Sequence, residues 1–388
     1  MYKFDSLFTE QEKSSANYHN LSIVLENMYN SIKRAQPNFK IDEAVAYANT
    51  SFGSTDYETN GLLHKVSLGL TKKTWDRLIA REIVGVQPMN GPVGLYYALR
   101  YYANGLYGGV NNEELGFNKV DPTYTGSMSV SAGEVLGSNV TGYEGLGFGD
   151  GTNIKELDIK LEKKQVEAKT RKLKARFSTE IFQDVFGMHN TNLKDQLWDG
   201  IAREIATEID VEIIEKIVSV ATQKTLDFAT VLGDNKSDKY NSFVAYVLNL
   251  ANQIGKATNH GNGNFVIASS NISGVIESTP QFSVSMLSDR QVEWDDRVCF
   301  AGTINGIKVY RNIFWNTDRY VVGYKGATEL DAGLFYLPYI FMYLDSIHEA
   351  SFQNSVGVMS RYAIGESIFG AEKYYQKVEV SNMDVLYT

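Results

Sequence analysis

The stretch LDIKLEKKQVEAKTRKLKARF, residues 157–177, carries the most legible local pattern in the chain. Leu157, Ile159 and Leu161 alternate with charged residues, and this period of two is typical of a β-strand with one apolar face. The alternation slips by one residue at Val166 and slips a second time further on. Because a one-residue slip turns the side chains over, we expect two bulges, or a bend and a bulge, in a long, twisted, largely exposed ribbon.

The same ribbon is strongly basic. It holds nine Lys or Arg residues from Lys155 to Arg176, against four acids. Such a strip either contacts DNA or an acidic neighbour, or simply keeps an exposed edge strand soluble. No aromatic residue is interleaved before Phe177, which disfavours binding of single-stranded nucleic acid. We therefore favour edge protection together with contact to an acidic partner surface.

A long helix is predicted directly after the ribbon, within residues 179–222. Apolar residues recur at every fourth position from Leu193 to Ile217, and each such step overshoots a helical turn by about 40°. The apolar stripe therefore winds around the helix. A helix over 192–222 would be about 46 Å long, which favours a spine that touches different layers along its length. The alternative is an ordinary buried helix of an α/β enzyme.

The remaining segments differ in character. Residues 1–75 are polar with short helical patches, which predicts either an arm lying on other parts of the structure or a floppy terminus. Residues 103–150 contain 11 glycines and predict an exposed functional loop. Residues 223–333 alternate helical and strand patterns and predict a separate mixed α/β unit. Residues 334–388 return to strands.

Composition narrows the class of protein. Of the 388 residues 43% are hydrophobic and 21% charged, which excludes a disordered chain. The net charge is 37 − 46 = −9, so a general role in binding nucleic acid is disfavoured. The single cysteine, Cys299, excludes internal disulfides. Neither a signal peptide nor an apolar stretch long enough to span a bilayer is found, and we expect no membrane partner.

The sequence predicts neither catalysis nor a cofactor. The five histidines are scattered without metal-ligand spacing, and no Gly-x-Ser-x-Gly nucleophile motif occurs. Alternate glycines at Gly145, Gly147 and Gly149 lack the lysine and helix that a phosphate loop requires. We therefore expect no catalytic, metal or cofactor site and no enzyme activity. Arms, ribbons and loops serve contacts between subunits better than they enclose a substrate.

Four colinear segments resemble the major capsid proteins of T-even-type tailed phages: residues 77–100, 168–184, 322–339 and 356–380. Examples are Gly-Val-Gln-Pro-Met at 85–89 and the run from Asp331 to Tyr339. The motif residues to which the resemblance gives a structural role are Gln87, Pro88, Met89, Gly91, Pro92, Arg100, Lys325, Gly326, Asp331, Gly333, Tyr336, Pro338, Arg361 and Tyr362.

The resemblance implies an α+β chain with the Hong Kong 97-type capsid fold, which consists of an arm, an extended loop, a peripheral domain and an axial domain. The implied boundaries are an N-terminal arm at 1–75, a segment leading into the peripheral domain at 76–102, an extended loop at 103–178, a spine helix at 179–222, an axial domain at 223–333 and return strands of the peripheral domain at 334–388. The domain that T-even-type subunits usually carry in the extended loop is expected to be reduced or absent here.

The implied function is self-assembly into hexamers and pentamers of a phage head around double-stranded DNA, in a virion built in the bacterial cytoplasm. Further expected partners are portal, scaffold and decoration proteins. Members of the family lose an N-terminal segment to a protease, but we expect residues 1–43 to stay attached. The side chains we expect at contacts between subunits are Leu157, Ile159, Leu161, Lys164, Lys169, Arg171, Lys172, Lys174 and Arg176.

Three alternatives remain open from the sequence. The alternatives to a major capsid protein are a vertex paralogue of the same fold, the shell protein of an encapsulin-like compartment, and a cytoplasmic α/β enzyme with a lid at 103–150. A shell without portal and DNA would indicate a compartment. A small soluble oligomer with a ligand pocket would indicate an enzyme.

Overall fold

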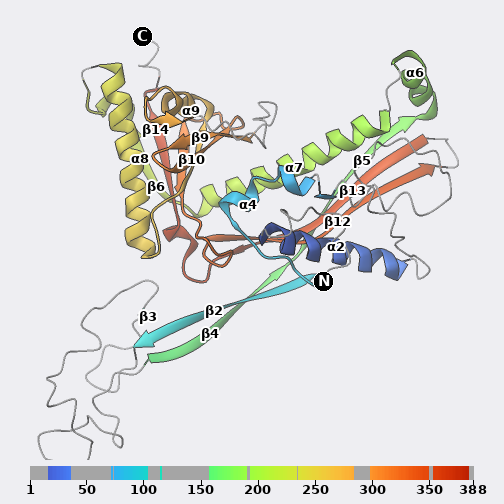
Figure 1. Ribbon diagram of the computed structural model, residues 1–388, viewed down its shortest axis with the longest axis horizontal. Coiled ribbons are helices and arrows are strands. Elements are labelled where there is room, and N and C mark those ends of the chain that lie inside the picture. Colours follow the sequence, from blue (N-terminus) through green and yellow to red (C-terminus); the bar gives the residue numbers. More distant parts are fainter. Residues whose placement is uncertain are drawn as a thin grey trace, which may run out of the picture.

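The computed structural model describes residues 16–35, 71–72, 74–103, 114–115, 157–189, 193–233, 235–283, 298–348 and 353–383. These residues form three β-sheets and several helices, so the chain is of mixed α+β class, as predicted. Figure 1 shows an elongated molecule with a two-stranded ribbon projecting from one side. The predictions for residues 1–15 and for most of the glycine-rich segment 103–150 lie outside the described residues.

A four-stranded sheet forms one half of the body. Its order is β1 (Gly85–Val86), β12 (Leu334–His348), β13 (Gln353–Glu366) and β5 (Lys169–Ser178). The long central pair β12–β13 is antiparallel, and β5 closes one edge by pairing antiparallel with β13. The long helix predicted after the ribbon packs on this sheet.

A seven-stranded sheet forms the other half, and helices α8 (Lys236–Thr258) and α9 (Ser270–Glu277) contact it. In order across the sheet, its strands are β6 (Thr222–Asp227), β14 (Tyr375–Ser381), β11 (Arg319–Gly323), β7 (Phe265–Ser269), β10 (Ile307–Asn312), β9 (Val298–Ile304) and β8 (Phe282–Ser283). The separate mixed α/β unit expected at 223–333 corresponds to most of this half.

The strand β14 corrects the predicted boundaries. The sequence placed all of 334–388 with the peripheral strands, but β14 pairs with β11 and β6 inside the seven-stranded sheet. The physical reason lies in its partners: Val378 and Val380 are buried in the core of the seven-stranded unit, between α8 and its sheet. The chain therefore returns to the seven-stranded unit at its C-terminal end.

The predicted long helix is confirmed as α7 (Leu193–Val220), while the preceding residues form a separate helix, α6 (Thr179–His189). With 28 residues α7 is about 42 Å long. Its winding stripe is buried at Ile205, Ile209 and Ile213. Because the stripe winds, α7 contacts β13 of one sheet and β14 of the other, as expected of a spine (Figure 1).

The N-terminal part of the chain is tied to this framework. Helix α2 (Ala16–Ala35) lies in the segment 1–75 for which short helical patches were predicted, and its residues Val24, Leu25 and Met28 are fully buried in the core that it shares with α7 and β12. Within the described residues, this part of the arm lies on the body of its own chain.

A buried carboxylate joins the short helix α4 (Ala80–Ile83) to α7. Asp210 is 5% exposed and accepts hydrogen bonds from the backbone N–H groups of Ile79, at 3.2 Å, and Ala80, at 3.0 Å. These donors stand at the N-terminus of α4, where N–H groups have no partner within the helix. Asp210 therefore fixes the segment that leads into β1.

We expect Gly200→Ala to stabilise the unassembled protein by about 0.5–1 kcal/mol, because glycine in a helix interior is less favourable than alanine. Gly200 is exposed within α7, and a Cβ atom built there meets nothing within 4 Å. Urea unfolding of the two proteins measures the difference. A lower stability for the variant would show that the site is more crowded than the structure indicates.

Candidate subunit interface

The ribbon that projects from the body consists of β2 (Val93–Ala103) and β4 (Leu157–Glu167), paired antiparallel along their whole length (Figure 1). The predicted strand at 157–177 therefore consists of two strands, β4 and β5, in different sheets. Ala168 lies between them and donates a backbone hydrogen bond to Pro92 at 2.9 Å. The predicted slip near Val166 corresponds to this change of sheet.

One face of the ribbon is apolar and exposed. Tyr101 stands opposite Ile159, so the two strands contribute to the same face. The exposed apolar members of the face are Val93 (45%), Leu95 (52%), Tyr97 (52%), Tyr101 (42%), Ile159 (63%) and Leu161 (62%). On the same face β4 also carries exposed polar residues opposite Tyr97, Leu95 and Val93, namely Lys163, Gln165 and Glu167. Six large apolar side chains exposed together on one ribbon are typical of a contact site. We call these six residues the ribbon face.

The opposite face of the ribbon is anchored at its base. Tyr96 is buried, its ring lies 5.6 Å from that of Phe335, and its hydroxyl donates to the carbonyl of Glu366 at 2.5 Å. Burial raises the pKa of Tyr96 to about 12. The ribbon is therefore held to the body on one side, while its other side remains open.

Ion pairs reinforce this base. The Glu366 carboxylate contacts Lys216 of α7 at 2.5 Å and Lys164 of β4 at 3.9 Å. The hydrogen bond from Lys216 lowers the pKa of Glu366 below its usual value. Strand β4, strand β13 and the spine helix thus meet at one carboxylate.

We expect this contact to make stability depend on pH. A carboxyl group whose pKa is lowered by folding contributes stability that is present above its unfolded pKa and is lost as the pH falls. The unassembled wild-type protein should therefore lose stability as the pH falls from about 5 to about 3, and the Lys216→Met variant should lose less over the same range. Thermal unfolding of both proteins across this range measures the effect. Parallel curves would contradict it.

Two residues predicted to contact other subunits form ion pairs within their own chain. Lys164 contacts Glu366, as above, and Arg171 forms an ion pair with Glu212 of α7 at 2.6 Å. The Arg171 guanidinium also lies 5.6 Å from the centre of the Tyr362 ring, and the Tyr362 hydroxyl donates to Glu212. Burial raises the pKa of Tyr362. Arg171 reaches Glu212 because its side chain lies on the face of β5 that packs on α7.

The other predicted contact residues are open. Ile159 and Leu161 belong to the ribbon face. The side chain of Leu157 lies outside the described residues. The remaining four, all exposed on β5, are Lys169, Lys172, Lys174 and Arg176.

The family-motif residues stabilise the body. The backbone N–H groups of Gln87 and Met89 donate to the carbonyls of Tyr336, at 3.0 Å, and Pro338, at 2.9 Å. Two motif segments far apart in sequence are thus hydrogen-bonded neighbours. Pro92 accepts the bond from Ala168, and its neighbours Pro88 and Gly91 belong to the same turn before β2.

A second group of motif residues lies around the turn between β11 and β12. Lys325 donates to the Arg81 carbonyl at 2.6 Å and contacts Glu329 at 3.3 Å, and burial lowers its pKa. The backbone N–H of Gly326 donates to Asp331 at 2.7 Å. These contacts hold the turn against the segment that contains α4.

The last three motif residues are structural or not described. A Cβ atom at Gly333 would lie 2.5 Å from the Tyr375 ring, so a larger residue would force the two sheets apart. Arg361 lies 5.3 Å from the centre of the Tyr339 ring. The side chain of Arg100 lies outside the described residues.

Strand β2 is the part of the interface that the sequence analysis missed. Val93, Leu95 and Tyr97 face outward, but residues 95–102 are almost all apolar or aromatic, so no period of two is legible there. The ribbon therefore also includes Val93–Ala103, most of which the sequence analysis placed in the segment leading into the peripheral domain, 76–102. A proline and glycine turn directly before an apolar run was the available signal.

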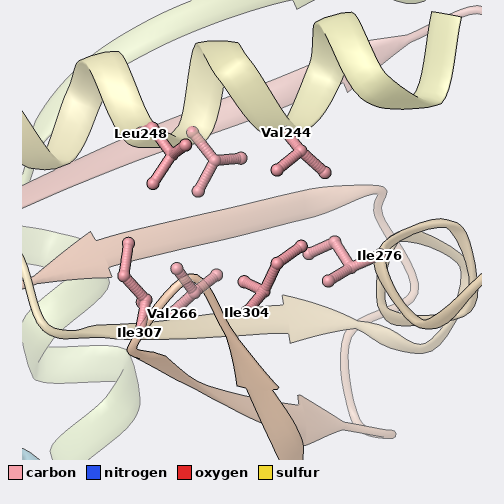
Figure 2. A pocket seen from close by; sticks show the side chains of 7 residues that line it. Val244, Leu248, Val266, Ile276, Ile304 and Ile307 are labelled. Atoms are coloured by element: carbon pink, nitrogen blue, oxygen red, sulfur yellow. The ribbon is translucent and has the colours of Figure 1, made fainter. Parts of the chain in front are cut away.

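The described residues do not assemble another kind of site. They contain no group of three or more His, Cys, Asp or Glu that could hold a metal ion, and none of their helices is long and apolar enough to cross a membrane. Figure 2 shows a gap between α8 and the seven-stranded sheet that has no room for a water molecule. It is lined by Val244, Val247, Leu248, Val266, Ile276, Ile304 and Ile307. This gap is part of the core.

Comparisons with known proteins agree with these features. The model of the major capsid protein Gp23 family matches residues 60–385. The major capsid protein of Vibrio phage KVP40 is 31% identical over 231 residues, which cover 54% of this chain and 45% of that protein. The major capsid protein of Enterobacteria phage T4 is 25% identical over 457 residues, which cover 89% of this chain and 86% of that protein.

A solved structure of the mature capsid of bacteriophage PhiM1 aligns with a TM-score of 0.45 at 8% identity, covering 89% of this chain and 92% of that chain. The chain spans less than half the length of the Vibrio phage relative. The four motif segments, by contrast, all fall within the residues that match the family model. Spine helix, ribbon and two-sheet body form the mixed α+β architecture that the resemblance led us to expect. The chain belongs to the Gp23 family of phage major capsid proteins.

Proposed function

We propose that this major capsid protein assembles into hexamers and pentamers that close into a phage head around double-stranded DNA. The observation that carries the proposal is the ribbon face, which is held open by the anchored base of the ribbon. Burying one exposed aliphatic side chain of the ribbon face in a contact between subunits stabilises that contact by about 1–2 kcal/mol. Repetition of the contact around a ring multiplies this gain.

The proposal gives each part of the molecule a role. The four-stranded sheet with α7 is the peripheral domain, the seven-stranded sheet with α8 is the axial domain, and the β2–β4 ribbon is the extended loop. Residues 1–75 form the arm. A contact between the ribbon of one copy and a different surface of the next is heterologous, and such contacts generate closed rings when the rotation closes.

The charge of the chain supports enclosure of DNA without tight binding. With a net charge of −9, the chain as a whole repels phosphate, which favours packaging and release. Portal, scaffold and decoration proteins complete the set of proposed partners, and assembly takes place in the host cytoplasm. A vertex role would place the same chain in pentamers alone.

Expression of the chain with its phage assembly partners, followed by sedimentation and electron microscopy, tests the proposal. We expect closed shells that contain both hexamers and pentamers. A small soluble oligomer under all assembly conditions would contradict it. Shells that never take up DNA in the presence of portal and packaging proteins would indicate a compartment, and shells with this chain at the vertices alone would indicate the paralogue.

A further inference from the structure

Within the part of the chain that the structure describes, a second exposed surface lies at the other end of the molecule, on helix α6 (Figure 1). None of its 11 residues is buried, and Ile181, Phe186 and Met188 are 52%, 55% and 80% exposed. The helix is held to its own chain through Phe182, whose ring lies 6.5 Å from that of Phe177. At 100° per residue Phe186 lies on the same side of the helix as Phe182, whereas Ile181 and Met188 share a different side. Helix α6 is thus attached at one side and exposes Ile181 and Met188 on another.

The exposed side of α6 is acidic as well as apolar. Glu180 and Asp184 are exposed and stand four residues apart, which places them on one side of the helix with Cβ atoms about 6 Å apart. Neither forms an ion pair with another described residue. An acidic, amphipathic helix of this kind fits a basic surface that also offers apolar contact.

Such a surface lies on the outer face of β5. Lys172, Lys174 and Arg176 are exposed and alternate with Leu173 and Ala175, which face α7. The three basic side chains therefore point away from α7 and form what we call the β5 basic strip. None of them forms an ion pair with another described residue.

The two surfaces match in spacing and character. Alternate residues on a strand are about 6.7 Å apart, close to the separation of Glu180 and Asp184 on their helix. Lys172 stands opposite the half-buried Met359 of β13, which supplies an apolar neighbour beside the charges. The distance between Glu180 and Asp184 on α6 is thus close to the distance between Lys172 and Lys174 on β5.

The strip and the helix of one chain do not meet. Helix α6 begins directly after β5, and its Phe182 contacts Phe177 on the α7 side of the sheet, whereas the strip points to the other side. The partner of each surface must therefore come from elsewhere. A second copy supplies both at once.

We propose that α6 of one copy docks on the β5 basic strip of the next copy, with Glu180 and Asp184 paired to Lys172 and Lys174. The proposal rests on the proposed function, self-assembly, and adds a contact separate from the ribbon face. Because it joins two different surfaces, the contact is heterologous and repeats around a ring.

Charge reversal and rescue test the contact. We expect E180K/D184K, and separately K172E/K174E, to raise the concentration needed for shell assembly about tenfold, since each ion pair becomes a repulsion that is repeated at every subunit. The quadruple variant should restore assembly to within about twofold of wild type. The neutral pair E180Q/D184N should have an intermediate effect. Circular dichroism of the unassembled variants checks that these exposed substitutions leave the fold intact.

The other outcomes are distinguishable. If wild type forms shells and the quadruple variant assembles no better than the two double variants, the α6 contact is wrong while the proposed function stands. If K172E/K174E assembles normally but packages less DNA, the strip contacts DNA and the proposal is again overturned. If wild type forms no shells, the proposed function fails, and the α6 contact fails with it.

Discussion

Replacing Ile159 and Leu161 together with aspartate is expected to abolish shell assembly while leaving the unassembled chain folded. Both side chains are more than 60% exposed in the ribbon face, so the change costs little in the free chain. In the proposed contact each carboxylate would be moved from water into apolar surroundings, which costs several kcal/mol when unpaired. We therefore expect the assembly concentration to rise at least about 100-fold.

The matched control for this variant keeps the surface apolar. Ile159→Val with Leu161→Met changes shape and little else, so shells should form near the wild-type concentration. Light scattering and sedimentation measure both variants, and circular dichroism reports their folding. Normal shells from the double aspartate variant would show that the ribbon face is not a subunit contact.

Removing the carboxylate of Asp210 is expected to produce the largest loss of stability among the polar changes considered. Asp210→Ala leaves the N–H groups of Ile79 and Ala80 without their acceptor, and Ala80 is fully buried. A buried donor without a partner costs about 1–3 kcal/mol, so we expect a loss of about 2–4 kcal/mol in the free energy of unfolding. The segment that carries α4 into β1 should loosen first.

Urea unfolding of the unassembled protein, followed by tryptophan fluorescence, measures this loss, since Trp75 and Trp198 lie in the same core as α7. Asp210→Asn is the matched control, because its amide keeps one acceptor oxygen and nearly the same volume. Its loss should be about half that of the alanine variant. An alanine variant within about 0.5 kcal/mol of wild type would show that water satisfies these donors.

Regular periods made part of the fold predictable. The alternation at Leu157, Ile159 and Leu161 predicted β4. The apolar residues at every fourth position predicted α7 together with its contacts to two layers. The sequence could not show that the ribbon changes sheets at Ala168, because a change of partner and a bulge both appear as a slip in alternation. The pairing of β14 was missed because strand partners far apart in sequence leave no local pattern.

The candidate interface was predictable only in part. The exposed apolar residues on β4 were identified because charged residues alternate with them. The sequence pattern of a basic side chain in a strand is the same whether the side chain contacts solvent, a helix of its own chain or another subunit. Lys164 and Arg171 meet Glu366 and Glu212 of their own chain. Glu212 lies in α7 and Glu366 in β13, far from Lys164 and Arg171 in sequence. Only the three-dimensional structure therefore distinguishes Lys164 and Arg171 from the open residues of the β5 basic strip.

Covalent footprinting of the ribbon face in free and assembled protein tests the central claim most directly. Tyr97, Tyr101 and Leu161 are now open to a diffusing label, while Tyr96 on the anchored side is buried and serves as an internal reference. If copies of the chain cover the ribbon face, labelling of the first three should fall at least about fivefold on assembly, with Tyr96 low in both states. Equal labelling of the ribbon face in free chains and in closed shells would contradict the account.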